Sequence, residues 1–491
     1  MIDLTIHQAC LDRNIQKARE NGVIIPTFEN MKHPETVPGK VKDRLKHVGL
    51  WDVDPLNLFR ITWKNEPLET GGLYRPVPNY IELPPELTGV PCRIIAMVGK
   101  WFPTGCHKVG ASFGCLAPRL VTGQFDVKAH KAVWPSTGNY CRGGAFNSAL
   151  LGAQGVAILP AEMSRERFDW LREIGAEVIA TPGCESNVKE IFDKTNELKQ
   201  DPHYMIFNQF EEMGNPLWHY NVTGNALADV YEAIKRPGDR FAGAAFTSGS
   251  AGTMSAGDLL KEKYPHLKLA VGEALQCPTI LENGFGGHRI EGIGDKHIPW
   301  IHNVKNTDMV IDIDDEDSQR LLRLFNTPEG QAYLKNELHL DDELIEKLTW
   351  LGISGIANVL CCIKMAKYYE FTERDVVGTV LTDSAVMYGS RIQELNDQYG
   401  AYNAHEAAMD HALHMLGLKL DNMQELTYAD RKRVHNLKYY TWVEQQGKTV
   451  EELNALWYDT EGTWDTVHAQ AKDLDDLINA FNEATGLLKD L

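Results

Sequence analysis

The segment GVAILPAEMSRERFDWLREIGAEVIATPG, residues 155–183, decides the fold class. Two apolar runs flank a central stretch, 164–175, in which Phe168, Leu171 and Ile174 fall on one face of a helix. A strand, a helix and a second strand in this order form the repeating unit of a parallel sheet. The segment therefore predicts an α/β protein.

The same alternation continues over much of the chain. Further strands are expected at 93–98, 241–246, 267–274 and 375–383, and a further helix at 355–370. We predict two α/β domains with parallel sheets, followed by a helical C-terminal extension.

The two ends of the chain differ from this pattern. Residues 1–65 are polar and irregular, and we expect an extended lead-in there. After residue 392 the pattern becomes helical, and Thr449 and Glu452 have the spacing of a capping box. We therefore expect helices, and no further sheet, in the last 100 residues.

Composition and charge narrow the class of protein. A chain of 491 residues is long enough for two or three domains, and its net charge of −19 disfavours a nucleic-acid partner. No window approaches ~18 consecutive apolar residues and no signal peptide is evident, so we expect a cytoplasmic protein without a membrane span. Nine cysteines without paired C-x-x-C spacing indicate reduced thiols and no metal site.

A glycine-rich turn lies between a strand and a helix in FTSGSAGTMSAGDLLKEKYP, residues 246–265. Small residues let backbone N–H groups converge there, and a helix beginning near Thr253 adds partial positive charge. The lysine of a P-loop is absent. The turn is therefore a candidate cup for a phosphate monoester, formed by Gly249, Ser250, Ala251, Gly252 and Thr253; the alternative is a tight strand-to-helix connection.

A second polar turn precedes a helix in WPSTGNYCRGGAF, residues 134–146. Ser136, Thr137, Gly138 and Asn139 can present hydroxyl and N–H donors to a carboxylate. The alternative is a helix cap with no ligand.

Lys108 lies at the start of an expected helix in WFPTGCHKVGAS, residues 101–112. Burial and the positive field of the helix end should lower its pKa, and an unprotonated amine is what Schiff-base chemistry needs. A surface lysine is the alternative. An amine, a phosphate cup and a carboxylate site on one α/β core together suit pyridoxal phosphate. Ser384, just after a predicted strand, can hydrogen-bond to the pyridine nitrogen of this cofactor.

The chain resembles the fold-type II pyridoxal phosphate enzymes, the family of cysteine synthase, threonine dehydratase and the tryptophan synthase β subunit. The similarity extends from about residue 70 to 391 and includes PTGCHKVG, the STGN to TPG block, NQFEEMGNPLWHYNVTG, EGIGDKHIP and TDSAVMYGSR. It implies an N-terminal extension at 1–65, a large cofactor-binding domain at 66–112 plus 206–391, a small mobile domain at 113–205 and a helical extension at 392–491.

The resemblance also implies roles for individual residues. Lys108 would bind the cofactor aldehyde, Asn139 would contact the ring 3′-oxygen, residues 249–253 would hold the phosphate and Ser384 would contact the pyridine nitrogen. Ser136, Thr137, Gly138 and Gln209 would bind the substrate carboxylate.

We therefore expect β-replacement or β-elimination on a small L-amino acid through an aminoacrylate, by a homodimer. A lyase, dehydratase or desulfhydrase that releases a 2-oxo acid is the alternative to a synthase. A partner-dependent subunit or a cofactor-binding scaffold with little activity alone is a third hypothesis. Arg142, which departs from the family pattern, either faces solvent or binds a second anionic group of the substrate.

Overall fold

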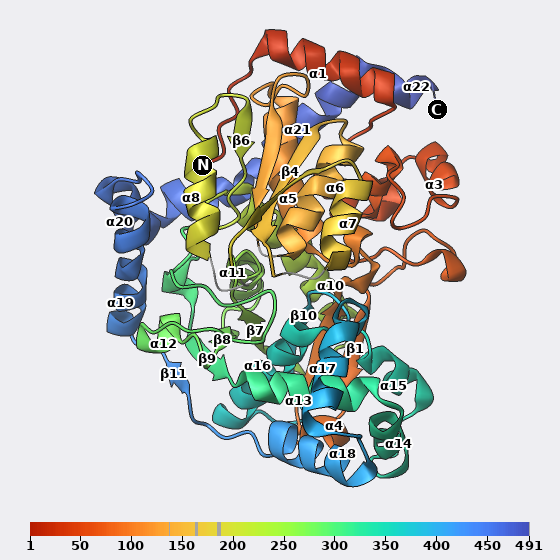
Figure 1. Ribbon diagram of the computed structural model, residues 1–491, viewed down its shortest axis with the longest axis vertical. Helices are drawn as coiled ribbons and strands as arrows, with labels where there is room; N and C mark the ends of the chain where they lie inside the picture. The colour runs from red at the N-terminus through yellow and green to blue at the C-terminus, as the bar shows by residue number, and fades with distance from the viewer. Residues whose placement is uncertain (137, 163–164, 184–187, 491) are drawn as a thin grey trace.

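The computed structural model describes residues 1–136, 138–162, 165–183 and 188–490 and contains two β-sheets (Figure 1). The larger sheet has seven strands in the order β1-β2-β10-β7-β8-β9-β11. Its strands are β1 (Tyr80–Leu83), β2 (Arg93–Val98), β7 (Arg240–Thr247), β8 (Lys268–Ala274), β9 (Met309–Ile313), β10 (Asp375–Leu381) and β11 (Met423–Glu425). The five central strands are parallel, and β1 and β11 pair antiparallel at the two edges.

The smaller sheet has four parallel strands in the order β5-β4-β3-β6. They are β3 (Lys131–Pro135), β4 (Gln154–Pro160), β5 (Glu177–Thr181) and β6 (Tyr204–Ile206). Helices α6 (Asn139–Leu150), α7 (Arg165–Glu173) and α8 (Val188–Leu198) lie between these strands in the chain. The strand, helix and strand expected over 155–183 are thus confirmed as β4, α7 and β5.

The central strands of the larger sheet are buried on both faces because helices cover them. Every residue of β2 and β10 is buried, as an apolar run in a parallel sheet requires. The middle helices are α4 (Pro85–Thr88), α5 (Lys108–Val121), α9 (Gly214–Trp218), α10 (Asn225–Ile234), α11 (Met254–Lys263), α12 (Thr279–Glu282), α13 (Asp315–Asn326), α14 (Pro328–Asn336), α15 (Asp342–Leu348) and α16 (Ile353–Tyr368). The predictions of β2, β7, β8, β10 and α16 are confirmed, whereas the strands β1, β3, β6, β9 and β11 were not foreseen.

The extended lead-in expected at residues 1–65 is wrong. The segment contains helices α1 (Gln8–Asn21), α2 (Phe28–Lys32) and α3 (Gly39–Leu45). Phe28 and Met31 in α2 are buried, as are Val41 and Leu45 in α3. These pairs lie three or four residues apart, so each short helix buries one apolar face, and the polar residues between the pairs concealed that pattern.

The C-terminal region is helical, as expected, except that it also supplies the edge strand β11. Its helices are α17 (Gly389–Tyr399), α18 (Ala404–His411), α19 (Tyr428–Lys438), α20 (Val450–Tyr458), α21 (Thr466–Thr485) and α22 (Leu487–Asp490). The capping box at the start of α20 is confirmed, with Thr449 and Glu452 bonded reciprocally.

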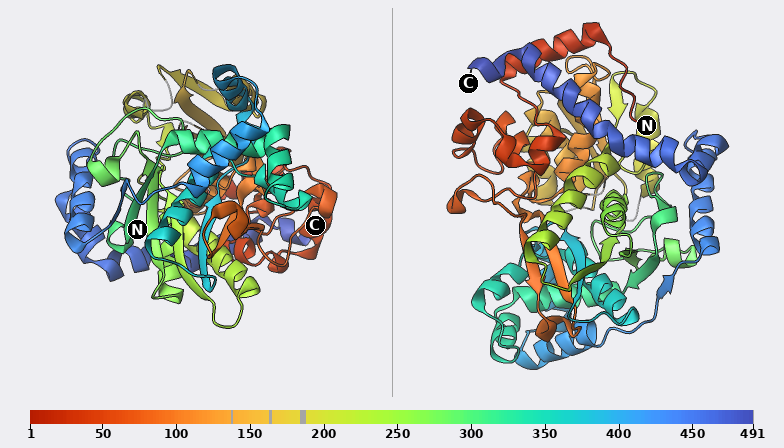
Figure 2. Two further views of the ribbon diagram at one scale, coloured as in Figure 1. Left: turned by 90° about the horizontal axis from the view of Figure 1, so that it is seen from below. Right: turned by 180° about the vertical axis from the view of Figure 1, so that it is seen from behind.

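Helices from the two terminal regions lie side by side next to the smaller sheet (Figures 1 and 2). Helix α21 packs beside α1, and the side chain of Asn482 exchanges hydrogen bonds with the backbone of Ile25. Arg19 also donates to the carbonyl of Thr485 at 2.8 Å. The terminal extension therefore ties the N-terminal helices to the rest of the molecule.

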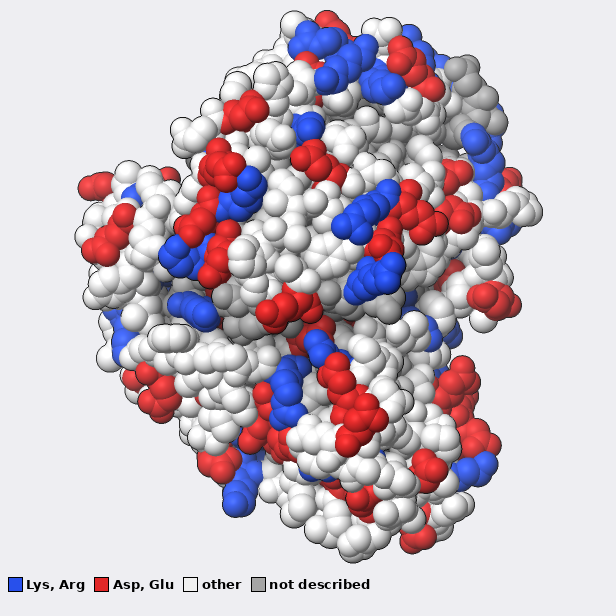
Figure 3. Space-filling view, in the orientation of Figure 1, with Lys and Arg blue, Asp and Glu red and all other residues white. Residues whose placement is uncertain are grey.

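Within the described part of the chain, no single helix has the length and apolar character needed to cross a membrane; one pair bent by 112°, α15 with α16, meets that test jointly. On the face shown in Figure 3, lysine and arginine side chains lie next to aspartate and glutamate, without a broad patch of one sign.

Candidate active site

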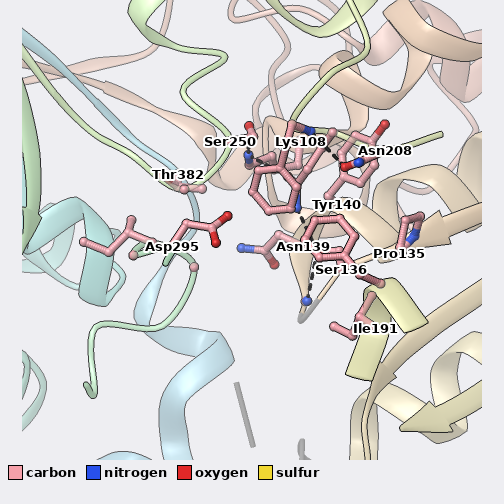
Figure 4. A pocket seen from close by; sticks show the side chains of 18 residues that line it. Lys108, Pro135, Ser136, Asn139, Tyr140, Ile191, Asn208, Ser250, Asp295 and Thr382 are labelled. Atoms are coloured by element: carbon pink, nitrogen blue, oxygen red, sulfur yellow. Dashed lines mark hydrogen bonds between the residues drawn. The ribbon is translucent and has the colours of Figure 1, made fainter. Parts of the chain in front are cut away.

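A cleft lies where loops after strands of both sheets come together (Figure 4). Strand β3 leads into the polar turn at 136, β7 into the glycine turn at 249 and β10 into Thr382. Ligands of parallel sheets bind at this carboxyl edge. The cleft is lined by Lys108, Pro135, Ser136, Gly138, Asn139, Tyr140, Ile191, Phe192, Asn208, Gln209, Phe210, Gly249, Ser250, Gly292, Ile293, Gly294, Asp295 and Thr382.

Lys108 is the first residue of α5, as expected from the sequence. A turn in which Thr104 and Gly105 both have φ of 67° directs the chain into this helix. The Nζ atom of Lys108 donates to Ser250 Oγ at 3.0 Å and to Gln209 Oε1 at 3.2 Å. Burial lowers the pKa of Lys108 to about 8, because water no longer stabilises the ammonium form. The predicted direction is confirmed, and desolvation is its cause.

The glycine turn forms the expected cup between β7 and α11, and α11 begins at Met254 with Thr253 as its N-cap. Ala251 has a left-handed backbone with φ of 62°. In the described part of the chain, none of the backbone N–H groups of residues 249–253 donates to a protein acceptor. Five N–H groups without acceptors beside a helix N-terminus suit an anion.

Side chains behind the cup also suit a phosphate. Asn215 Nδ2 donates to Ser250 Oγ at 3.1 Å, and the buried ring of His219 lies against the backbone of Gly252. The ring of His107 lies 5.1 Å from that of His219. Neither nitrogen of His107, nor Nε2 of His219, has a hydrogen-bond partner among the described residues. Burial lowers the pKa of His107 to about 3 and holds the pKa of His219 well below its usual value, because water no longer stabilises the charged imidazolium.

The polar turn before α6 brings together donors for a carboxylate. Ser136 Oγ accepts from the backbone N–H of Gly138 at 3.3 Å and from Gln209 Nε2 at 3.4 Å. These three residues line the same cleft as Lys108. Thr137, the remaining residue predicted to bind the substrate carboxylate, lies outside the described residues.

Asn139 is bonded to Asp383, the chain neighbour of Ser384, which the sequence did not single out. Asn139 Nδ2 donates to Asp383 Oδ2 at 2.7 Å, and the hydroxyl of Tyr388 donates to the same oxygen at 2.7 Å. Ser384 follows Asp383 directly and is 4% exposed, but it is not among the described residues that line the cleft, whereas Thr382 is. Asp383 thus orients the amide of Asn139, and its position just before Ser384 in TDSAVMYGSR was the signal for it.

Arg142 occupies neither of the two places expected for it. It is 5% exposed, which rules out a solvent-facing side chain, and it is absent from the residues that line the cleft. Its guanidinium lies 5.5 Å from the ring centre of Trp51 and 5.1 Å from that of Trp170. Arg142 therefore joins the N-terminal segment to α7.

Asp295 is a second functional candidate that the sequence reasoning missed. It lies in EGIGDKHIP, and its carboxylate points into the cleft toward Asn139 (Figure 4). An isolated aspartate in a loop forms no spacing motif with other residues. The only signal for Asp295 in the sequence was its location in EGIGDKHIP, one of the segments that resemble the family.

A buried lysine amine, a backbone cup for phosphate and donors for a carboxylate together define a site for pyridoxal phosphate and an amino acid. The family model described as "Pyridoxal-phosphate dependent enzyme" matches residues 99–333. A cysteine synthase of Staphylococcus aureus is 32% identical over 257 residues, which are 52% of this chain and 74% of that protein. A probable cysteine synthase of Bacillus subtilis is 33% identical over 198 residues, so the match spans 40% of this chain and 62% of that relative.

Solved structures show the same fold. An O-acetylserine sulfhydrylase from Entamoeba histolytica superposes with a TM-score of 0.57 at 21% identity, covering 70% of this chain and 94% of that one. A hydrogen sulfide-producing enzyme from Fusobacterium nucleatum gives a TM-score of 0.53 at 22% identity, and the match covers 63% of this chain and 95% of that one.

The chain belongs to the pyridoxal phosphate-dependent enzyme family that contains the cysteine synthases. It is an enzyme whose cofactor is pyridoxal phosphate, and the unpartnered donors around the cup fit the phosphate of that cofactor. The expected α/β fold of the fold-type II class is confirmed.

Proposed function

We propose that the chain catalyses β-replacement or β-elimination on a small L-amino acid. The observation that carries this proposal is the position of Lys108 Nζ, within hydrogen-bond distance of both Ser250 in the glycine turn and Gln209, which we expect to bind the substrate carboxylate. Pyridoxal phosphate, when bound, supplies an aldehyde that reacts with amines and a ring that withdraws electrons from the α-carbon of an amino acid.

The chain's own residues position the amino acid and move its proton. Ser136, the N–H of Gly138 and Gln209 would hold the α-carboxylate, and residues 249–253 would hold the cofactor phosphate. Lys108 Nζ would take the α-proton, since a pKa of about 8 leaves a fraction of this amine unprotonated at neutral pH. Its position between Ser250 and Gln209 fixes the direction from which the proton is removed.

Replacement and elimination differ in what happens after the β-substituent leaves. The cysteine synthases of S. aureus and B. subtilis support replacement by an external nucleophile. A lyase, dehydratase or desulfhydrase reaction is the alternative, because loss of the β-substituent is common to replacement and elimination. Product analysis with and without a thiol nucleophile separates the two: replacement gives a new amino acid, whereas elimination gives a 2-oxo acid and ammonia.

Lys108→Ala tests the proposal. The wild-type protein should be yellow with bound cofactor and should consume a β-substituted amino acid such as O-acetylserine. The variant should lose turnover by several orders of magnitude, and borohydride should no longer attach the cofactor to the chain. Lys296→Ala, which removes an exposed lysine near the cleft, is the matched control and should behave as wild type.

Two outcomes would contradict the proposal. Undiminished borohydride attachment in Lys108→Ala would place the reactive lysine elsewhere. A yellow wild-type protein that converts no β-substituted amino acid would favour the partner-dependent subunit or scaffold.

The homodimer and the cytoplasmic location expected from the sequence stay predictions. Ultracentrifugation of the purified holoenzyme tests the homodimer.

A further inference from the structure

Asp295 is the acidic group of the cleft. Its side chain is 4% exposed, and its carboxylate points toward Asn139 across the cleft (Figure 4). Among the described residues that line the cleft, Lys108 and Asp295 carry the formal charges. Once Lys108 is bonded to the cofactor, Asp295 is the charged side chain that remains to face a substrate.

The carboxylate of Asp295 has few partners within the protein. Nδ1 of His297 lies 2.8 Å from Oδ1, and otherwise neither oxygen receives a hydrogen bond from the described part of the chain. The ring of His297 is itself held by aromatic neighbours, with ring centres 4.9 Å from Phe210 and 5.6 Å from Phe192. A buried carboxylate that lacks donors is costly, and a ligand that brings a donor or a positive charge removes that cost.

The backbone holds Asp295 in place. Its carbonyl accepts from the hydroxyl of Thr279 at 2.6 Å, and the N–H of Gly294 donates to the carbonyl of Ser248 at 3.0 Å. Ser248 directly precedes the phosphate cup. The acid is therefore fixed relative to the cofactor site before any ligand arrives.

Charge decides how an amino acid would lie in this cleft. The α-carboxylate is repelled by Asp295 and attracted by the neutral donors of Ser136, Gly138 and Gln209. The opposite end of the amino acid, which is its β-substituent, is then the part that approaches Asp295.

We propose that Asp295 binds the β-substituent of the substrate and selects one that carries a positive charge, such as an ammonium group, over an anionic one. This inference rests on the proposed function, because it assumes an amino acid bound through its α-amine and α-carboxylate. It replaces the hypothesis of a second anionic group, since Asp295 lines the cleft and Arg142 is not among the described residues that line it.

Three amino acids of equal chain length test the selection in the holoenzyme: 2,3-diaminopropionate with an ammonium group, serine with a neutral hydroxyl and O-phosphoserine with an anion. Their dissociation constants follow from the change in absorbance of the bound cofactor, whichever reaction ensues. The wild-type enzyme should bind 2,3-diaminopropionate at least tenfold more tightly than O-phosphoserine.

The Asp295→Asn variant should reverse this order in part. Binding of 2,3-diaminopropionate should weaken at least tenfold, binding of O-phosphoserine should tighten at least threefold, and serine should change less than threefold. Glu282→Gln removes an exposed acid of the neighbouring helix α12 and should leave all three constants within twofold. A general structural defect cannot move the cation and the anion in opposite directions.

The outcomes separate the two proposals. If serine alters the cofactor spectrum but the wild-type enzyme shows no preference for the cation, the role of Asp295 is refuted and the proposed function stands. Equal changes for all three ligands in Asp295→Asn would refute it as well. If no amino acid alters the spectrum, the proposed function fails and this inference fails with it. The order of the three dissociation constants in the wild-type enzyme can be measured without any variant. The inference can therefore be refuted even if Asp295→Asn does not fold.

Discussion

Gly252 in the phosphate cup has no room for a side chain, so Gly252→Ala should weaken cofactor binding. A Cβ atom there would lie 2.1 Å from Asn215 Oδ1 and 2.9 Å from His219 Cδ2. Asn215 is fully buried, and its Nδ2 holds Ser250 Oγ at 3.1 Å and the carbonyl of Gln209 at 3.0 Å. An alanine at position 252 must therefore displace Asn215 and, with it, the hydroxyl of Ser250.

The expected loss follows from these contacts. In the variant the cofactor would have to bring Asn215 and Ser250 back into the binding geometry without the two hydrogen bonds that now hold them, which costs about 2 kcal/mol at about 1 kcal/mol each and corresponds to roughly 30-fold weaker binding of pyridoxal phosphate. Gly252→Asp should be worse, because a carboxylate would then lie beside a phosphate dianion in a poorly hydrated site.

The assay is a titration of cofactor-free protein with pyridoxal phosphate, followed by the absorbance of the bound form. Urea denaturation of each variant checks that it is folded. Gly39→Ala is the control, since a Cβ at this first residue of α3 meets no atom within 4 Å. A folded Gly252→Ala variant that binds the cofactor within twofold of wild type would refute the assignment of the cup.

Three further predictions concern single side chains. Burial holds the pKa of Lys108 at about 8 in the folded state, against 10.5 when exposed, so the free energy of unfolding of the cofactor-free protein should rise between pH 8 and pH 10.5. Denaturation curves of Lys108→Met should lack this rise. The same dependence of stability on pH in both proteins would contradict the prediction. Ser384→Asp should favour protonation of the cofactor ring nitrogen and add transamination or racemisation, measured by chiral product analysis; unchanged products would mean that residue 384 does not contact the ring. Arg142→Ala should lower the free energy of unfolding by about 1–3 kcal/mol by removing the cation that lies against both Trp51 and Trp170. Equal stability of that variant and wild type, with a raised KM for anionic substrates alone, would restore the hypothesis that Arg142 binds substrate.

Local sequence determined those parts of the fold that depend on neighbours in the chain. The apolar runs at β2, β4, β7, β8 and β10 predicted strands because each is buried on both faces of a parallel sheet and needs no alternation. The helix starts at Lys108, Asn139 and Met254 were also foreseen, since turn residues and caps act within a few positions.

Shorter elements could not be predicted from local sequence, for a physical reason. Strand β11 has three residues and exists because β9 offers an antiparallel edge more than 100 positions earlier in the chain. Helices α2 and α3 of the N-terminal segment are likewise short, with five and seven residues, and packing against distant residues stabilises them more than their own composition does.

The candidate site shows the same division. The sequence by itself indicated Lys108 and the 249–253 turn as candidates, because an amine at a helix start and a small-residue turn are local features. Tertiary structure alone brought Lys108 to Ser250, 142 positions away, and Asn139 to Asp383, 244 positions away. It also placed Asp295 in the cleft and the guanidinium of Arg142 against two tryptophans that contact each other. Whether a charged side chain faces a ligand depends on which strands pair and which loops meet, and no residue's immediate neighbours contain that information.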